Sequence, residues 1–390
     1  MARLPLIVAL VSLVSLSLHS LTCASEENAS GVLPPEVVAF RAGLETLVRQ
    51  NRLPGVAVGI LRDQELIWAD GIGYADLENK TPASPTTPYR LASVSKPFAA
   101  VLIMQLVEKG KLELNTPMAQ FRVPSRYRQK PILIRHVLSH TSEGVPGSVY
   151  QYSGDCYSDL TLVIEEVTGK SYPRVLKSNI LDPTQMRRSV PGPMAPGYET
   201  IIGDLALPYE VFEGVPVRSA YPIVVPNWSS SHEQDWTVVG FLKRTEDFTR
   251  REILGNAYTP LHGMQTSGGL VSTITDLAKF DVALDRDRLI TRESKEQIFT
   301  PAVSNSGKKL PYGLGWFVQQ HKGLKLVWHY GEWPPTHSSL YLKVPQKDLT
   351  LVILANCAGL SSPYSLWQGN VLASPYATLF LETCVLDEKD

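Results

Sequence analysis

Apolar residues near the start of the chain gather in two short stretches, residues 56–60 and 66–69. Both are rich in residues that favour strands, and the polar residues 62–64 lie between them, so the pattern predicts two strands joined by a turn. Residues 95–108 differ, because the centre of this segment is apolar on every face. A helix that is apolar all round is buried, so the segment predicts a central helix.

The middle of the chain, about residues 111–255, contains more proline and polar residues. Short helices are predicted at residues 134–139 and 157–168. Proline, glycine and serine are frequent over residues 192–236, which predicts long loops. The middle of the chain therefore predicts a mostly helical and loop-rich region.

The last third of the chain changes character again. A helix is predicted over residues 272–285, with Thr273 or Thr275 as its cap. Four apolar stretches with short polar turns then predict successive strands in an antiparallel meander, at residues 314–319, 325–329, 339–344 and 350–355.

Strands near both ends of the chain predict an α/β (α+β) fold with one antiparallel sheet built from both chain ends and flanked by helices. The sheet region would cover about residues 35–110 and 256–390, and the helical region about residues 111–255. A cleft between the two regions is the natural place for a site.

The N-terminus has the pattern of a secretory signal. Arg3 precedes the mostly apolar residues 4–18, and small residues at 22–24 offer a cleavage point. We predict a signal peptide over residues 1–24 and a secreted or periplasmic catalytic domain over residues 25–390. The alternative is an uncleaved N-terminal membrane anchor. No later apolar run reaches the length of about 20 residues that a membrane span needs.

Composition limits the partners of this chain. It has 390 residues, of which 44% are hydrophobic and 19% charged, with a formal net charge of −1. The apolar content is sufficient for a large core. The near-neutral charge, without a long run of one sign, predicts no binding to nucleic acid or to an anionic membrane surface. The oligomeric state cannot be predicted from these properties.

Cysteines and asparagines add two open questions. Signal cleavage would leave three cysteines: Cys156, Cys357 and Cys384. Either Cys357 pairs with Cys384 in an oxidising compartment, or all three remain thiols. Three N-x-S/T triplets would accept glycans in a eukaryotic secretory pathway, and they begin at Asn28, Asn79 and Asn227.

The candidate chemistry starts at an S-x-x-K tetrad formed by Ser93 and Lys96. Serine needs a nearby base to become a nucleophile. On a helix, residues three apart share a face with Cβ atoms about 5–6 Å apart, so Lys96 can reach the Ser93 hydroxyl. A second tetrad at residues 306–309 lies in a polar turn, where no chemistry is expected. The alternative reading of Ser93 is a helix cap with a solvated lysine.

Several segments then resemble one family. Residues 87–96 (TPYRLASVSK) and 106–112 (LVEKGKL) are similar to the nucleophile region of class C β-lactamases and related esterases and D-peptidases. Further resemblance follows in the right order, at residues 134–142, 267–273 and 312–316. The resemblance runs from about residue 35 to residue 380 and implies a β-lactamase/transpeptidase-like fold.

The family's second motif, Y-x-N, resembles residues 152–154 of this chain. The resemblance implies that Tyr152 is a general base or proton shuttle. Gly154 stands where the family has an asparagine that binds the substrate amide and orients the lysine. Either Asp155 substitutes from the next position or that function is lost.

The family's third motif, K-T-G or H-x-G, resembles residues 329–331, at the end of a predicted strand. The resemblance implies that His329 sets the protonation of Tyr152 and faces the substrate. Gly331 would allow a close approach of the backbone. The N–H groups of Glu332 and Ser93 would form an oxyanion hole.

These inferences predict a serine hydrolase that forms an acyl-enzyme intermediate with small esters, amides, D-peptides or β-lactams, without a metal or cofactor. Its partner would be a small-molecule or short-peptide substrate. The histidine of the third motif favours an esterase or D-peptidase over a dedicated β-lactamase. The alternatives are a non-catalytic homologue with a binding or scaffolding role and a D-Ala-D-Ala carboxypeptidase or transpeptidase. His136 and His140 have a zinc-compatible spacing but no evident third ligand, so we interpret them as packing and turn residues.

Overall fold

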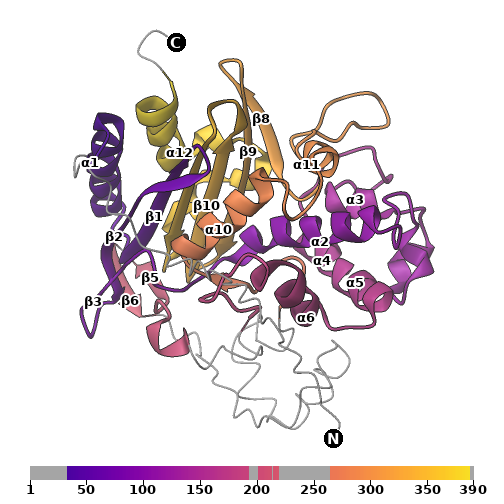
Figure 1. Ribbon diagram of the computed structural model, residues 1–390, viewed down its shortest axis with the longest axis horizontal. Coiled ribbons are helices and arrows are strands. Elements are labelled where there is room, and N and C mark those ends of the chain that lie inside the picture. Colours follow the sequence, from indigo (N-terminus) through magenta and orange to yellow (C-terminus); the bar gives the residue numbers. More distant parts are fainter. Residues whose placement is uncertain (1–32, 193–200, 213, 219–263, 387–390) are drawn as a thin grey trace, which may run out of the picture. The chain divides into compact units, whose positions relative to one another are not determined.

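The computed structural model describes residues 33–192, 201–212, 214–218 and 264–386 (Figure 1). The predicted signal peptide, Asn28, Asn227 and part of the predicted loops lie outside these residues. Pro35–Asp390 forms one compact unit. Among the helices described, none combines the length and the apolar character needed to cross a membrane.

Seven strands form the main sheet, in the order β3-β2-β1-β11-β10-β9-β8. Their bounds are Gly55–Arg62 (β1), Glu65–Asp76 (β2), Thr81–Pro82 (β3), Phe317–His321 (β8), Leu324–Trp333 (β9), His337–Val344 (β10) and Leu349–Ala355 (β11). All neighbours pair antiparallel. Strands β1 and β11 join the two ends of the chain at the centre of the sheet, which confirms the predicted architecture.

The first predicted hairpin is present, with longer strands than expected. Its turn has φ angles of 51° at Asp63 and 62° at Gln64. Two positive φ angles are typical of the turn whose twist matches that of the flanking strands. The C-terminal meander is also present, but β9 continues to Trp333. The sequence had placed His329 at the end of the strand, but the residue lies inside β9.

Helices cover both faces of the sheet (Figure 1). Helix α1 (Pro35–Gln50) packs with α12 (Pro375–Phe380), and the Phe40 ring lies edge-on to Trp68 of β2 and to Phe380, at 6.1 and 5.9 Å. Helix α10 (Ile274–Asp285) contacts β1 so closely that a Cβ atom on Gly59 would lie 2.5 Å from Ile274. Trp68 pairs with Ile60 and so lies on the same face as Ile60, opposite to its neighbour Gly59. Helices α1 and α10 therefore cover opposite faces of the sheet.

Helix α2 (Lys96–Glu108) is the buried central helix that the sequence predicts. Every residue from Lys96 to Leu106 is buried. Its Phe98 ring stacks on Phe280 of α10, with ring centroids 3.9 Å apart. On the α10 side, the predicted cap is Thr273, whose hydroxyl accepts the Asp276 N–H. The stacked rings thus pack the first turn of α2 against α10.

Five further α-helices are described, four of them within residues 111–255. They are α3 (Ile134–Leu138), α4 (Gly154–Ser158), α5 (Leu160–Thr168), α6 (Tyr172–Leu176) and α11 (Arg292–Ile298). The helix predicted over residues 157–168 is confirmed mainly as α5 and ends at Thr168 as expected, but a break at Asp159 separates α5 from α4. Asp159 accepts a hydrogen bond from the Tyr127 hydroxyl and pairs with Arg126. These contacts come from a distant segment, so no local pattern reveals them.

Two small sheets complete the description. Strand β4 (Tyr89–Arg90) pairs with β7 (Val271–Ser272), and β5 (Tyr209–Phe212) pairs with β6 (Val215–Arg218). The β5–β6 hairpin corrects the prediction of continuous loops over residues 192–236. Its strands have four residues each, and the surrounding proline and glycine obscured them in the sequence.

The three cysteines described are free thiols. Cys357 is buried at the end of β11, and burial raises its pKa to about 11. Cys384 lies near α1, where its thiol contacts the Glu36 carbonyl at 3.7 Å. The disulfide between Cys357 and Cys384 is therefore absent from the structure. Asn79 is exposed between β2 and β3.

A buried ion pair connects the sheet to α10. Lys343 of β10 and Asp281 of α10 are 2% and 1% exposed. The lysine Nζ lies 2.5 Å from Asp281 Oδ1 and 2.9 Å from Asp285 Oδ2, and it also donates to Thr350. Charges that have left water are tolerated only when they are paired and hydrogen-bonded in this way.

Replacing Lys343 with methionine should therefore destabilise the protein. Lys343→Met leaves the Asp281 carboxylate buried without its cation, and we expect the free energy of unfolding to fall by about 3–5 kcal/mol. Urea denaturation followed by circular dichroism measures the loss. Lys177→Ala, which breaks the exposed pair with Asp182, is the control and should cost at most about 1 kcal/mol. Equal losses in the two variants would contradict a special role for the buried pair.

Candidate active site

Ser93 lies in the 3₁₀-helix η1 (Ala92–Ser95), which leads directly into α2. The preceding Leu91 is held from two sides: its N–H donates to the Leu270 carbonyl, and its carbonyl accepts the Ser339 hydroxyl at 2.8 Å. Ala92 has a φ of 47°, so the chain turns sharply just before the serine. Contacts from β10 and from the segment before β7 thus fix the nucleophile's backbone.

Strand β9 passes this segment at Gly331. A Cβ atom on Gly331 would lie 2.1 Å from the Leu91 carbonyl oxygen and 2.2 Å from Ser339 Oγ. No side chain fits at such distances, so only glycine allows β9 to approach the serine segment this closely. Strand β8 pairs with β9 only as far as Trp328, and residues 329–333 continue beyond that pairing.

Lys96 is joined to Ser93 as the tetrad predicts. Its Nζ donates to Ser93 Oγ at 2.8 Å and to the Ser267 carbonyl at 3.1 Å. The ammonium lies 4.8 Å from the centre of the Tyr152 ring, although the lysine itself is only 1% exposed. Burial disfavours the charged form and lowers the pKa of Lys96 to about 7. A substantial share of the lysine is thus an uncharged proton acceptor at neutral pH.

Tyr152 lies just before α4, with its ring over the lysine. Its hydroxyl is buried and makes no hydrogen bond of normal geometry with the described residues. Burial raises the pKa of Tyr152 above its usual value; the Ser93 hydroxyl opposes this rise and the Glu332 carboxylate adds to it. The phenol therefore keeps its proton at neutral pH, so Tyr152 is a proton donor more readily than a base.

His329 lies beneath the site and does not face open space. Its side chain is fully buried, with Nε2 2.8 Å from the Tyr312 hydroxyl and Nδ1 2.6 Å from the Tyr330 carbonyl oxygen. Burial and the nearby Lys96 hold the pKa of His329 well below its usual range. A neutral ring that donates from Nδ1 accepts the Tyr312 hydroxyl at Nε2. Both nitrogens are therefore engaged away from Tyr152, whose ring centre is 6.3 Å from that of His329.

The structure does not bring Asp155 to the lysine. Asp155 is exposed in the first turn of α4, and the two hydrogen bonds of Lys96 go to Ser93 and Ser267. Gly154 is also exposed, and a Cβ atom placed there would meet nothing within 4 Å. The family asparagine is thus replaced by glycine at a position with room for a side chain.

Glu332 lies within electrostatic reach of the site. It is half-buried, and its carboxylate accepts the Ser362 hydroxyl. Burial raises the pKa of Tyr330, and the neighbouring Tyr152 and Glu332 side chains raise it further. An acidic group therefore lies beside the two tyrosines at the edge where β9 approaches the nucleophile.

Sequence reasoning missed the aromatic residues that surround Tyr152. The rings of Tyr330 and Phe317 lie 5.8 and 5.9 Å from it, and His140 is closer at 4.3 Å. It also missed the contact between Lys96 and the Ser267 carbonyl. Ser267 and Tyr312 do fall in the family-like segments 267–273 and 312–316, which were the available signal. Their individual contacts depend on tertiary packing.

The two histidines with zinc-like spacing serve other purposes. His136 Nδ1 accepts the Leu133 N–H, and His140 Nδ1 accepts the Ser153 N–H. In the part of the chain that the structure describes, no group of three or more histidine, cysteine, aspartate or glutamate residues could hold a metal ion.

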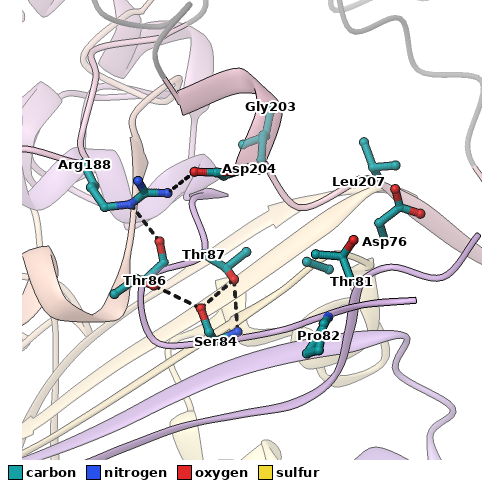
Figure 2. Close-up of a pocket in the computed structure, with 12 residues that line it drawn as sticks. Asp76, Thr81, Pro82, Ser84, Thr86, Thr87, Arg188, Gly203, Asp204 and Leu207 are labelled. Carbon is teal, nitrogen blue, oxygen red and sulfur yellow. Dashed lines mark hydrogen bonds and ion pairs between the residues drawn. The ribbon is translucent and has the colours of Figure 1, made fainter. Parts of the chain in front are cut away.

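A separate pocket of about 510 Å³ lies between the β2–β3 connection and residues 203–207 (Figure 2). Its polar groups bond to one another: Arg188 donates to the Thr86 carbonyl and pairs with Asp204, and the Ser84 hydroxyl contacts Thr87. None of the predicted site residues lines it. The pocket is therefore distinct from the serine–lysine cluster.

Ser93 is hydrogen-bonded to a buried lysine at the start of a buried helix, and a strand with a glycine passes beside it. This arrangement is a serine–lysine site of the S-x-x-K type. The Beta-lactamase family model matches residues 40–372, and the chain therefore belongs to the β-lactamase family.

Individual relatives agree with this assignment. The chain is 27% identical to penicillin-binding protein 4* of Bacillus subtilis over 349 residues, covering 80% of this chain and 70% of that protein. An octameric penicillin-binding protein homologue from Pyrococcus abyssi has a TM-score of 0.67 at 22% identity, over 86% of this chain and 76% of the other. The D-amino acid amidase from Ochrobactrum anthropi has a TM-score of 0.65 at 20% identity, over 90% and 98% of the two chains.

The lowered pKa of Lys96 predicts a particular pH profile. If Lys96 accepts the proton of Ser93, its ammonium must first lose a proton, and kcat/KM for a neutral ester should rise with pH through a midpoint near 7 before levelling off. Lys96→Arg, which stays protonated, should abolish the rise together with most of the activity. A midpoint near the ordinary lysine value of 10.5 would contradict the effect of burial.

Proposed function

We propose that this protein is a serine hydrolase that acts through an acyl-enzyme on small esters, amides or short D-peptides. The observation that carries the proposal is the 2.8 Å contact between Lys96 Nζ and Ser93 Oγ in a buried setting. A buried lysine is costly, and among the described residues Lys96 has no acidic partner to offset that cost. Its position beside a serine, with a pKa near 7 because of burial, suits a general base.

The proposed reaction assigns one role to each group. Neutral Lys96 takes the proton of Ser93 Oγ while that oxygen bonds to the substrate carbonyl carbon. The N–H groups of Ser93 and Glu332 stabilise the resulting oxyanion. Tyr152 gives its phenolic proton to the leaving group as the bond to it breaks. Tyr152 then recovers a proton from Lys96, and water releases the acyl group from Ser93 by the same steps in reverse order.

Covalent labelling tests the nucleophile. A neutral fluorophosphonate should add to Ser93 in the folded protein, and peptide mass spectrometry locates the added mass. Ser93→Ala should lose the label completely, because the reactive oxygen is gone. Ser306→Ala is the matched control, since Ser306 begins the second tetrad in an exposed turn, and its labelling should equal that of the wild type. A wild type without label at Ser93 would favour the alternative of a non-catalytic homologue with a binding role.

The Glu332 carboxylate at the site favours some substrates over others by their charge. Glu332 carries a negative charge near Tyr152, and the hydrogen bond from Ser362 holds the carboxylate in place. A substrate with its own carboxylate would be repelled there. This argues for neutral substrates and against peptides ending in a free D-alanine carboxylate, which a D-Ala-D-Ala carboxypeptidase or transpeptidase would need to accept.

Matched esters test this preference. We expect 4-nitrophenyl valerate to be hydrolysed with a higher kcat/KM than the mono-4-nitrophenyl ester of glutaric acid, which has the same chain length and a terminal carboxylate. Glu332→Gln should raise kcat/KM for the charged ester about fivefold relative to the neutral ester, since partly exposed charges interact by about 1 kcal/mol; any change in the proton donor Tyr152 affects both esters and cancels in this ratio. Glu45→Gln on α1 is the control. An equal change for both esters would show that Glu332 does not select by charge.

A further inference from the structure

His140 occupies an unusual backbone position directly after α3. It is 1% exposed and has a φ of 53°. Few residues other than glycine adopt this left-handed conformation, although histidine, asparagine and aspartate do so more readily than most. The conformation turns the chain so that both the carbonyl and the side chain of His140 point toward the segment around Tyr152.

His140 binds the backbone on both sides of Tyr152. Its carbonyl accepts the N–H of Gln151 at 2.8 Å, and its Nδ1 accepts the N–H of Ser153 at 3.1 Å. Between these two bonds, the imidazole ring lies 4.3 Å from the centre of the Tyr152 ring at an angle of 36°. One residue thus contacts the ring of the proposed proton donor and binds the N–H groups of the residues directly before and after it.

Tyr152 depends on such contacts because its own hydroxyl anchors it only weakly. That hydroxyl is buried near the Ser93 hydroxyl but makes no hydrogen bond of normal geometry with the described residues. The neighbouring rings of Phe317 and Tyr330 are more distant than His140, at 5.9 and 5.8 Å. The flanking backbone and the closest ring are therefore the main contacts that orient the ring over Lys96.

Packing alone does not account for an imidazole at this place. His140 Nε2 is buried and has no hydrogen-bond partner among the residues described, which costs free energy. An apolar ring of similar size would fill the space without that cost. What the imidazole adds is the acceptor Nδ1, which satisfies the Ser153 N–H.

We propose that His140 is a positioning residue that holds Tyr152 in the orientation needed to donate its proton. The inference rests on the proposed function, in which Tyr152 protonates the leaving group. His140 itself stays outside the proton transfer. Burial, together with Lys96 and His329, holds the pKa of His140 well below its usual range, so its ring remains neutral and Nδ1 remains an acceptor.

Two substitutions of His140 distinguish the contribution of its Nδ1 acceptor from that of its imidazole ring. His140→Gly suits the left-handed backbone but removes both, and we expect kcat for a neutral ester to fall about tenfold to a hundredfold with KM changed less than about twofold. His140→Asn also tolerates this backbone, and its Oδ1 takes the place of Nδ1. It should recover a large part of kcat. His136→Asn is the matched control, because His136 Nδ1 also accepts a backbone N–H but does not contact Tyr152. Its kcat should equal that of the wild type.

The same substitution in a Tyr152→Phe background shows whether His140 affects kcat through Tyr152. This variant lacks the phenolic proton, so the orientation of the ring no longer matters, and adding His140→Gly should lower the remaining kcat less than about twofold. Equal losses in both backgrounds would overturn the proposal, because they would show a general structural effect. So would a wild-type kcat in His140→Gly. If the glycine variant does not fold by circular dichroism, the same comparison is made with His140→Asn, whose smaller loss should likewise vanish beside Tyr152→Phe.

Fluorophosphonate labelling keeps this inference distinguishable from the proposed function. Ser93 should be labelled in the wild type and, more slowly, in His140→Gly, since the nucleophile and Lys96 are intact in both. Labelled Ser93 with no dependence of kcat on His140 would overturn only the positioning role. An unlabelled wild type would overturn both proposals.

Discussion

The burial of one lysine at the start of α2 is the constraint on which the site depends. Helix α2 is apolar on every face and is surrounded by the rest of the protein. Its first residue is therefore removed from water together with the helix. Lys96 therefore needs polar partners inside the protein, and it finds the Ser93 hydroxyl and the Ser267 carbonyl. Two glycines let the surrounding segments come close: Gly331 meets the serine segment, and a Cβ atom on Gly315 would lie 2.4 Å from Ala100 of α2.

The same burial shifts the pKa values of the two titratable groups next to Ser93 in opposite directions. It lowers the pKa of Lys96 to about 7 and raises the pKa of Tyr152, because each charged form is disfavoured away from water. Near neutral pH the site thus holds an uncharged amine that can accept a proton and a phenol that can donate one. Two groups whose pKa values are separated by a shared environment can take the complementary roles that acyl transfer requires.

The sequence predicted the elements whose patterns are local. The apolar stretches of the meander strands and the all-round apolar character of α2 are each visible within the element itself, and Ser93 and Lys96 share a face because of helix geometry alone. The break at Asp159, the carbonyl bonded to Lys96 and the partner of His329 depend on residues far apart in the chain. His329 illustrates the limit, because the pairing of β9 with β8 and β10 decides where its side chain points. A short motif does not contain that information.

The departures from the family pattern lie mostly at positions near the proposed substrate. Gly154 leaves open space where the Y-x-N pattern would place an amide, and Glu332 adds an acid beside Tyr152. Neither change removes a partner of Lys96, since the Ser267 carbonyl and the Ser93 hydroxyl hold the ammonium without any side chain at position 154. The groups proposed to move the proton therefore keep a complete set of contacts, while the groups that would recognise a substrate differ. This division is expected when the same chemistry is applied to a different acyl compound, whereas a chain that had become a scaffold would have no physical reason to keep a lysine buried at this cost.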